Sequence, residues 1–130
     1  TPTLNEGQIV LAFKSENIDR NDLIAFYQGN KILVKRVIAL QGDYVTITEN
    51  GDVYVNQVLV KEPYIDSKCL GNSDIKYPYQ VPDGSYFVLG DKRDTSMDSR
   101  NSIIGTISDE DVIGKVKFGI WPLNEFGILK

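Results

Sequence analysis

The sequence contains no histidine and only one cysteine, Cys69. Without histidine, the chain cannot use Ser-His-Asp or Cys-His catalysis, HExxH zinc hydrolysis or most catalytic zinc sites. A single cysteine excludes an intramolecular disulfide and a thiolate cluster for zinc or iron–sulfur. We therefore expect neither a metal nor another cofactor, and a hydrolase with this sequence must use a base other than histidine.

The sequence also lacks long apolar runs and clusters of positive charge. No run approaches the roughly 18 to 20 apolar residues of a membrane-spanning helix. The net charge of -4 and the absence of a Lys/Arg cluster argue against a nucleic-acid partner. The 130 residues, 42% hydrophobic and 25% charged, fit one folded domain. The first residues, TPTLNEG, are neither a signal peptide nor a usual start, so we expect a piece of a longer protein.

Short runs of branched and aromatic residues, separated by Gly, Pro, Asn and Asp, predict an all-β fold with at most one or two helical turns. The predicted strands cover residues 8–13, 22–27, 32–40, 44–48, 53–55, 58–60, 85–89 and 112–120. Tight turns between neighbouring strands, such as the one at Asn50-Gly51, predict an antiparallel meander. Residues 61–83 carry three prolines and predict a long irregular excursion, and residues 108–111 predict a capped helical turn.

One lysine, Lys35, lies in the middle of the apolar stretch 32–43, ILVKRVIALQGD. Side chains alternate between the faces of a strand, so Lys35 and Arg36 must point to opposite sides. If both faces are covered, one of these cations is partly desolvated. Burial disfavours the ammonium form and lowers a lysine pKa, which would make Lys35 a base near neutral pH. The alternative is a lysine that reaches water from a strand edge and titrates normally.

A polar segment, residues 90–102 (GDKRDTSMDSRNS), lies between apolar strands. Charged, serine-rich segments in such places are usually solvated loops. The near balance of charge instead favours a partly buried ion-pair network, formed by Asp91, Asp94, Asp98, Lys92, Arg93 and Arg100. The segment also supplies two hydroxyls, Ser96 and Ser99. Either hydroxyl could orient a neutral Lys35 amine or act as a nucleophile.

Four stretches of this sequence together resemble one protein family. Residues 34–43 (VKRVIALQGD) and 89–100 (LGDKRDTSMDSR) closely resemble two signature boxes of the type I signal peptidases, membrane-anchored serine proteases with a Ser-Lys dyad. Residues 1–4 (TPTL) resemble the end of the nucleophile box, Ser-Met-x-Pro-Thr-Leu. Residues 20–26 (RNDLIAF) resemble the Arg-Gly-Asp box, with asparagine in place of glycine. The boxes keep the family's order and span nearly the whole chain.

The resemblance implies roles for four residues, two catalytic and two structural. Lys35 aligns with the general base, and Ser96 aligns with the hydroxyl that binds and orients it. Asp98 and Arg100 align with a structural salt bridge behind the dyad. The resemblance implies no metal site.

The resemblance also implies a fold and a substrate site. The fold is two antiparallel β-sheets, in agreement with the strand pattern. Ile32, Leu33 and Val34 align with the edge where a signal peptide adds as a β-strand. Small pockets nearby are expected to accept alanine-like side chains before the cleavage point.

The family places its nucleophilic serine two residues before Thr1, and its transmembrane anchor further upstream. By this resemblance, residues 1–130 are the extracellular catalytic domain of a cell-membrane enzyme and are expected to be inactive as given. The parent would remove signal peptides from secreted preproteins, pilins among the candidates, after an Ala-x-Ala-like site. Hydroxyl and main-chain donors would form the oxyanion hole. The short excursion at 61–83 resembles the compact Gram-positive type.

Three alternatives stay open from the sequence. The first is a non-proteolytic, signal-peptidase-like chaperone for pilus assembly, against which the retention of Lys35 weighs. The second is a self-cleaving repressor-type protease, which also uses Ser-Lys but would carry a DNA-binding module. The third is a plain β-rich binding module, which would make the four ordered boxes a coincidence. The sequence does not indicate an oligomeric state.

Overall fold

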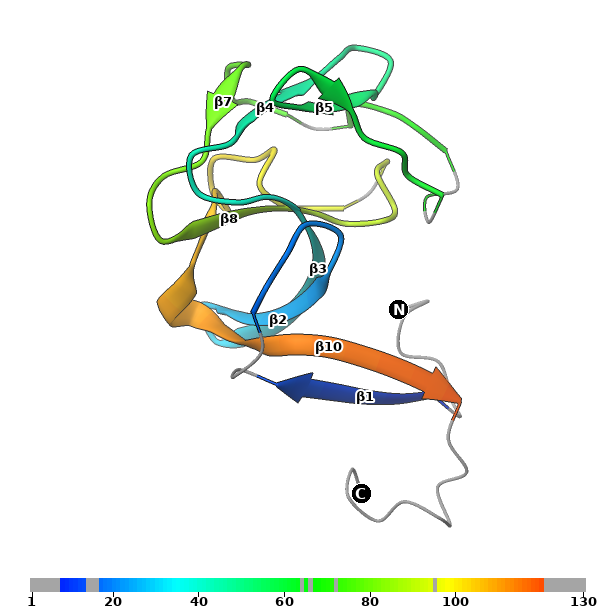
Figure 1. Cartoon of the computed structure of the whole chain (residues 1–130), viewed down its shortest axis with the longest axis vertical. Helices are drawn as coiled ribbons and strands as arrows, with labels where there is room; N and C mark the ends of the chain where they lie inside the picture. Colours follow the sequence, from blue (N-terminus) through cyan, green and yellow to red (C-terminus); the bar gives the residue numbers. More distant parts are fainter. Residues whose placement is uncertain are drawn as a thin grey trace.

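The chain forms two antiparallel β-sheets stacked one above the other (Figure 1). The computed structural model describes residues 8–13, 17–63, 65, 67–71, 73–94 and 96–120. The larger sheet has the order β1 (Gln8–Phe13), β10 (Val112–Ile120), β2 (Leu23–Gln28), β3 (Lys31–Ala39), β8 (Ser85–Leu89) and β9 (Ile107–Ser108). The smaller sheet has the order β6 (Val58–Leu59), β5 (Val53–Val55), β4 (Tyr44–Ile47) and β7 (Tyr79–Gln80).

The predicted all-β class and eight of the predicted strands are confirmed, with ends shifted by one residue or so. The predicted meander is wrong in three respects, because β10 lies between β1 and β2, β3 pairs with β8, and β4 pairs with β7. Local turn signals do not encode this pairing of distant strands. The strands β7 and β9 were not predicted, since each has only two residues and, unlike β6, neither lies in an uninterrupted run of apolar residues. The capped turn is confirmed as η2 (Asp109–Asp111), where the Ser108 hydroxyl accepts from Glu110 N–H.

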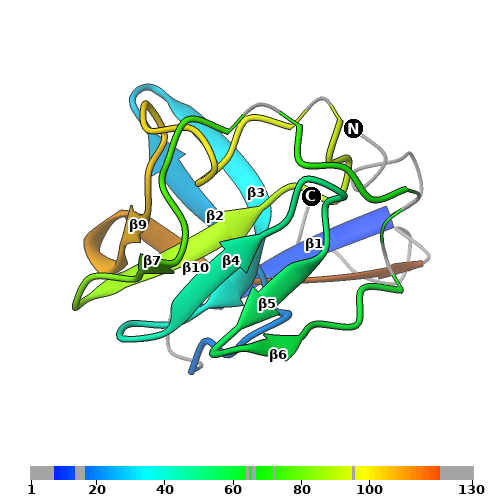
Figure 2. The same cartoon turned by 90° about the horizontal axis from the view of Figure 1, so that it is seen from above.

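The strand β3 connects the two halves of the larger sheet and bends as it does so (Figures 1 and 2). It pairs with β2 along residues 31–36, and with β8 only through Arg36, Val37 and Ala39. Burial rises along β3, from exposed Lys31 to fully buried Ala39. The end that pairs with β8 is covered on both faces.

Two hydrophobic clusters cover those faces. One lies between the sheets and contains Ile38, Ala39, Val45, Ile47, Val53, Val55, Val81, Phe87 and Leu89. The other lies on the opposite face of the larger sheet and contains Ile24, Phe26, Val37, Val88, Ile107 and Val112. Because Val37 enters one cluster and Ile38 the other, both faces are covered here, and a polar side chain near this end must find a protein partner.

The turn between β3 and β4 is fixed by a buried carboxylate, Asp43. It accepts hydrogen bonds from the Leu40 N–H (2.8 Å), the Asn56 amide (3.0 Å) and both ends of the Arg20 guanidinium (2.8–3.0 Å). Burial alone would raise the pKa of Asp43, but these hydrogen bonds and the Arg20 charge outweigh it and lower that pKa. The ion pair therefore joins the Arg20 segment to the end of the lysine strand.

Candidate active site

Lys35 is half-buried on β3, and its amine lies against a hydroxyl of the polar segment. The Lys35 Nζ donates to Ser96 Oγ at 2.9 Å. Burial lowers the pKa of Lys35, and the Arg100 charge lowers it further, whereas Asp98 and Asp91 oppose the shift without reversing it. The Lys35 side chain is thus half-buried rather than fully exposed, and its amine has a hydroxyl partner.

Arg36 points to the opposite side of β3, as the alternation of a strand requires. Its Nε and Nη2 donate to the two oxygens of Asp91 at 3.0 and 2.9 Å. Its Nη1 donates to the Asn21 carbonyl at 2.8 Å. Arg36 thus forms a bidentate ion pair with a carboxylate, whereas Lys35 has a neutral hydroxyl as its hydrogen-bond partner.

The structure separates the two candidate hydroxyls, Ser96 and Ser99. Ser99 is buried and committed to the main chain, because its Oγ accepts from Val88 N–H (2.9 Å) and donates to the Gly105 carbonyl (2.8 Å). Ser96 is only half-buried, and its hydroxyl meets Lys35. The geometry thus brings Ser96, and not Ser99, to the lysine.

Asp98 and Arg100 form an ion pair whose side chains are both 0% exposed. The Arg100 Nε and Nη2 donate to the two oxygens of Asp98, each at 2.9 Å. Arg100 also donates to the main-chain oxygens of Leu70 (2.7 Å) and Ser96 (3.3 Å). A buried pair of this kind needs such further hydrogen bonds to offset its desolvation, and here they hold the Ser96 main chain.

The solvated-loop interpretation of the polar segment is wrong for its central residues. Arg93, Asp98, Ser99 and Arg100 are buried, and only the flanking charges of Lys92 and Asp94 are exposed. The expected ion-pair network exists, but two of its pairs reach outside the segment, from Asp91 to Arg36 and from Arg93 to Glu62. Local sequence patterns do not indicate these partners, which lie 55 and 31 positions away along the chain.

A further residue that sequence reasoning missed is Gly90. A Cβ built at Gly90 would overlap the Ser96 side chain and lie 3.3 Å from the Lys35 Nζ. The Ser96 hydroxyl therefore rests directly on the Gly90 main chain. The only local signal for this role is the glycine itself, at the end of an apolar strand.

The predicted docking edge, Ile32 to Val34, lies beside Lys35 on β3. Val37 exchanges hydrogen bonds with the Asn21–Asp22 main chain, each 2.7 Å long. By strand alternation, the main-chain groups of Ile32 and Val34 point away from β2. Within the described residues, no strand pairs with this stretch on that side, because β8 begins its pairing at Arg36. The Ile32 side chain is exposed, and those of Leu33 and Val34 are half-buried.

Two negative findings concern the described ranges alone. Nothing helical there has the length and apolar character of a membrane span. Nor do three or more Cys, Asp or Glu side chains gather there as they would around a metal ion.

The fold is a two-sheet antiparallel β-domain in which a half-buried lysine lies against a serine hydroxyl, and comparison with known proteins identifies its family. The family model described as signal peptidase, peptidase S26, matches residues 1–121. Signal peptidase I of Streptococcus pneumoniae serotype 4 is 31% identical over 165 residues, covering 97% of this chain and 79% of the relative. Signal peptidase IB of Staphylococcus aureus strain Mu50 is 34% identical over 146 residues, covering 96% and 74%.

Solved structures agree. The crystal structure of a signal peptidase I from Enterococcus faecalis superposes with a TM-score of 0.66 at 28% identity, covering 78% of this chain and 98% of that one. The chain belongs to the signal peptidase family, peptidase S26. It is thus a serine peptidase of the kind that removes signal peptides, and the pilus-chaperone alternative finds no support among these relatives.

Proposed function

We propose that this chain cleaves preproteins with a Ser-Lys dyad in which Lys35 is the general base. The observation that carries the proposal is the 2.9 Å hydrogen bond from the half-buried Lys35 amine to Ser96. Burial lowers the pKa of Lys35, so a larger fraction of the amine is neutral near pH 7. By the family resemblance, the nucleophile is a serine two residues before Thr1.

Proton transfer follows from the geometry of the amine. A neutral amine has two hydrogens and one lone pair, and donation of one hydrogen to Ser96 orients that lone pair. The lone pair accepts the proton of the nucleophilic serine as its oxygen attacks the scissile carbonyl. The ammonium then returns this proton to the leaving amine, and an acyl-enzyme remains for water to hydrolyse. Ser96 positions the base and receives no part of the substrate.

The substrate is proposed to bind as an added strand on the open edge of β3. The outward-pointing main-chain groups of Ile32 and Val34 would pair with the residues before the cleavage site. An extended peptide bound there runs past Lys35, one residue further along the strand. Small side chains, as in Ala-x-Ala, suit a site packed this closely against the base.

The setting of the enzyme is also part of the proposal. We infer a single-pass anchor upstream of residue 1, with the catalytic domain on the extracellular face of the cell membrane. The relatives from Streptococcus, Staphylococcus and Enterococcus support the compact Gram-positive type. No observation favours pilins over other preproteins as substrates.

The test uses the chain extended upstream through the residue two before Thr1, with a preprotein-derived peptide that contains Ala-x-Ala. We expect cleavage after the second alanine, and its loss when the upstream serine is replaced by alanine. The control replaces the second alanine of the substrate by phenylalanine, which should block cleavage by the intact enzyme. Cleavage that survives replacement of the upstream serine would contradict the dyad.

The contact between Gly90 and Ser96 yields a second prediction. The added methyl group of Gly90→Ala overlaps the Ser96 side chain, so we expect the hydroxyl to leave Lys35. Cleavage should fall about 100-fold or more, and overpacking should lower the free energy of unfolding by about 1 to 3 kcal/mol. In a Gly90→Ala/Ser96→Gly double variant the space is restored without the hydroxyl. Stability should recover there, and activity should not; recovery of both would show that Ser96 has no part in positioning the base.

A further inference from the structure

The irregular excursion at residues 61–83 is tied to the polar segment that carries Ser96. Near its middle, the Leu70 carbonyl accepts from Arg100, and Asp74 N–H donates to the Arg100 carbonyl at 3.1 Å. At its start, Glu62 forms a buried ion pair with Arg93. The excursion thus contacts and stabilises the polar segment 90–102, which in turn packs against Lys35.

The Glu62–Arg93 pair is almost completely removed from solvent, with 5% and 1% of the respective side chains exposed. The Arg93 Nη1 and Nη2 donate to the two carboxylate oxygens of Glu62 in a bidentate arrangement. The remaining donor, Nε, binds the Gly90 carbonyl at 2.8 Å. Because the guanidinium is planar and its donors keep a fixed relative geometry, a movement of Glu62 also moves the Arg93 donor that binds the Gly90 carbonyl.

Gly90 is in turn held on both sides of its Cα. Its N–H donates to Asp98 Oδ2 at 2.9 Å, and its carbonyl accepts from Arg93. The Ser96 side chain rests on this Cα, and the Lys35 Nζ lies close to it. A Gly90 carbonyl released from Arg93 can turn toward other donors, and the surface that supports the Ser96 hydroxyl then moves.

We propose that Glu62 is a positioning residue for the Lys35–Ser96 pair, acting through Arg93 and the Gly90 carbonyl. The proposal rests on the function proposed above for Lys35 and assigns a role to the excursion in the same site. The described contact that links Glu62 to the polar segment is its ion pair with Arg93, and Glu62 acts through this partner. Its contribution is to keep the Ser96 hydroxyl on the amine and water away from it.

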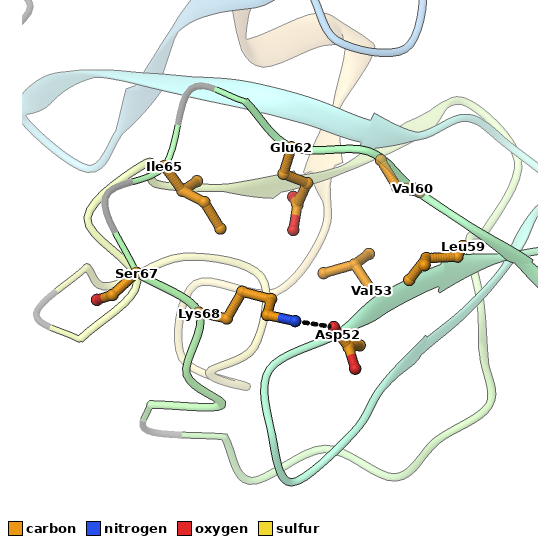
Figure 3. A pocket seen from close by; sticks show the side chains of 8 residues that line it. All are labelled: Asp52, Val53, Leu59, Val60, Glu62, Ile65, Ser67 and Lys68. Atoms are coloured by element: carbon orange, nitrogen blue, oxygen red, sulfur yellow. Dashed lines mark hydrogen bonds and ion pairs between the residues drawn. The ribbon is translucent and has the colours of Figure 1, made fainter.

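The surroundings of Glu62 offer a matched control. Glu62 also lines a pocket of about 460 Å³ on the smaller-sheet side, together with Val53, Val60 and Ile65 (Figure 3). A second ion pair, Lys68 to Asp52 at 2.7 Å, crosses the same pocket (Figure 3). This second pair is more exposed and makes no hydrogen bond to the polar segment among the contacts described. Lys68→Gln therefore removes a charge from the same pocket without touching Arg93.

The test measures the titration of Lys35 directly, by NMR of lysine-labelled chain 1–130, and so needs no activity. Two variants remove the Glu62–Arg93 ion pair. The first is Glu62→Gln. The second is the double variant Glu62→Leu/Arg93→Met, which leaves no unpaired charge in the interior and is expected to fold even if the first does not. In both we expect the pKa of Lys35 to move upward, toward its ordinary value, because water gains access to the amine. Lys68→Gln should leave the titration unchanged.

In the extended enzyme, the same variants should move the acid limb of the kcat/KM profile to higher pH. Cleavage at neutral pH should fall by roughly 100-fold, mainly through kcat, as expected for a displaced catalytic group. A merely structural role would lower the folded fraction and leave the Lys35 titration and the acid limb where they are. A folded double variant with the parent's Lys35 titration would overturn the proposal. If Lys35 titrates normally in the unmodified chain, the proposed base fails instead, and the two failures are distinguishable.

Discussion

Replacement of Lys35 by methionine is expected to abolish signal-peptide cleavage while the fold is retained. Methionine keeps most of the side-chain volume and removes the amine, so the lost activity reports the base itself. We expect kcat to fall at least about 10⁴-fold, the upper end of what a positioned general base contributes. Steady-state cleavage of an Ala-x-Ala peptide by the extended chain measures the loss. Lys31→Met, at the exposed start of the same strand, is the control and should cleave normally.

The same variant should have a characteristic dependence of stability on pH. The folded-state pKa of Lys35 is lowered from 10.5 chiefly by burial, so between the folded-state and unfolded-state values the unfolded chain binds more protons. The free energy of unfolding contributed by Lys35 therefore rises with pH across this window, and the penalty for the buried ammonium is present in full only below it. Relative to Lys35→Met, the parent chain should gain stability as the pH rises toward 10.5.

Urea unfolding of both chains at a series of pH values checks this expectation. Below the window, Lys35→Met should be as stable as the parent or more stable, because methionine has no charge to desolvate. Parallel curves for the two chains would mean that Lys35 has an ordinary pKa in the folded state. Normal turnover by Lys35→Met would remove Lys35 from the mechanism altogether.

Replacement of Arg100 by methionine is expected to have the largest effect on stability. It leaves the Asp98 carboxylate, whose side chain is 0% exposed, without its counter-ion, and removes the hydrogen bonds to Leu70 and Ser96. Breaking a buried pair from one side costs about 3 to 5 kcal/mol. This is a large part of the roughly 5 to 15 kcal/mol that stabilises a typical domain. The fall in the urea midpoint of chain 1–130, at constant m-value, measures it.

Two further variants separate the causes of that loss. Lys115→Met breaks a partly exposed ion pair with Asp22, 3.3 Å long, and should change the free energy of unfolding by no more than about 1 kcal/mol. The double variant Asp98→Leu/Arg100→Met removes both charges and should recover much of the stability lost in Arg100→Met. A loss in Arg100→Met no greater than that in Lys115→Met would contradict the burial of the Asp98–Arg100 pair.

The Lys35–Ser96 pair shows how much the local sequence can predict. The apolar run around Lys35 was enough to predict a strand, one partly desolvated cation and the opposite orientations of Lys35 and Arg36. It left two partners open for the amine, Ser96 and Ser99, because both hydroxyls lie in one polar segment. The choice between them depends on the hydrogen bonds that commit Ser99 to Val88 and Gly105.

The ion pairs show the opposite case. The near balance of charge in residues 90–102 predicted a buried network, and the resemblance to the family predicted the pairing of Asp98 with Arg100. Nothing in the sequence identified Glu62 as the partner of Arg93 or Arg36 as the partner of Asp91. Each of these pairs joins segments that only the folded sheets bring together.

The sequence by itself determined eight of the strands, the all-β class, the absence of histidine and the apolar setting of Lys35, because all of these depend on residue type and local period. The tertiary structure alone decided that β10 lies between β1 and β2 and that Gly90 supports the Ser96 hydroxyl. It also decided that β8 pairs with β3 only from Arg36 onward, so that Val34 has no partner strand on that side among the described residues. These features arise from contacts between residues far apart in the chain. The free energy of such contacts depends on which surfaces meet, and no local pattern of side chains specifies that.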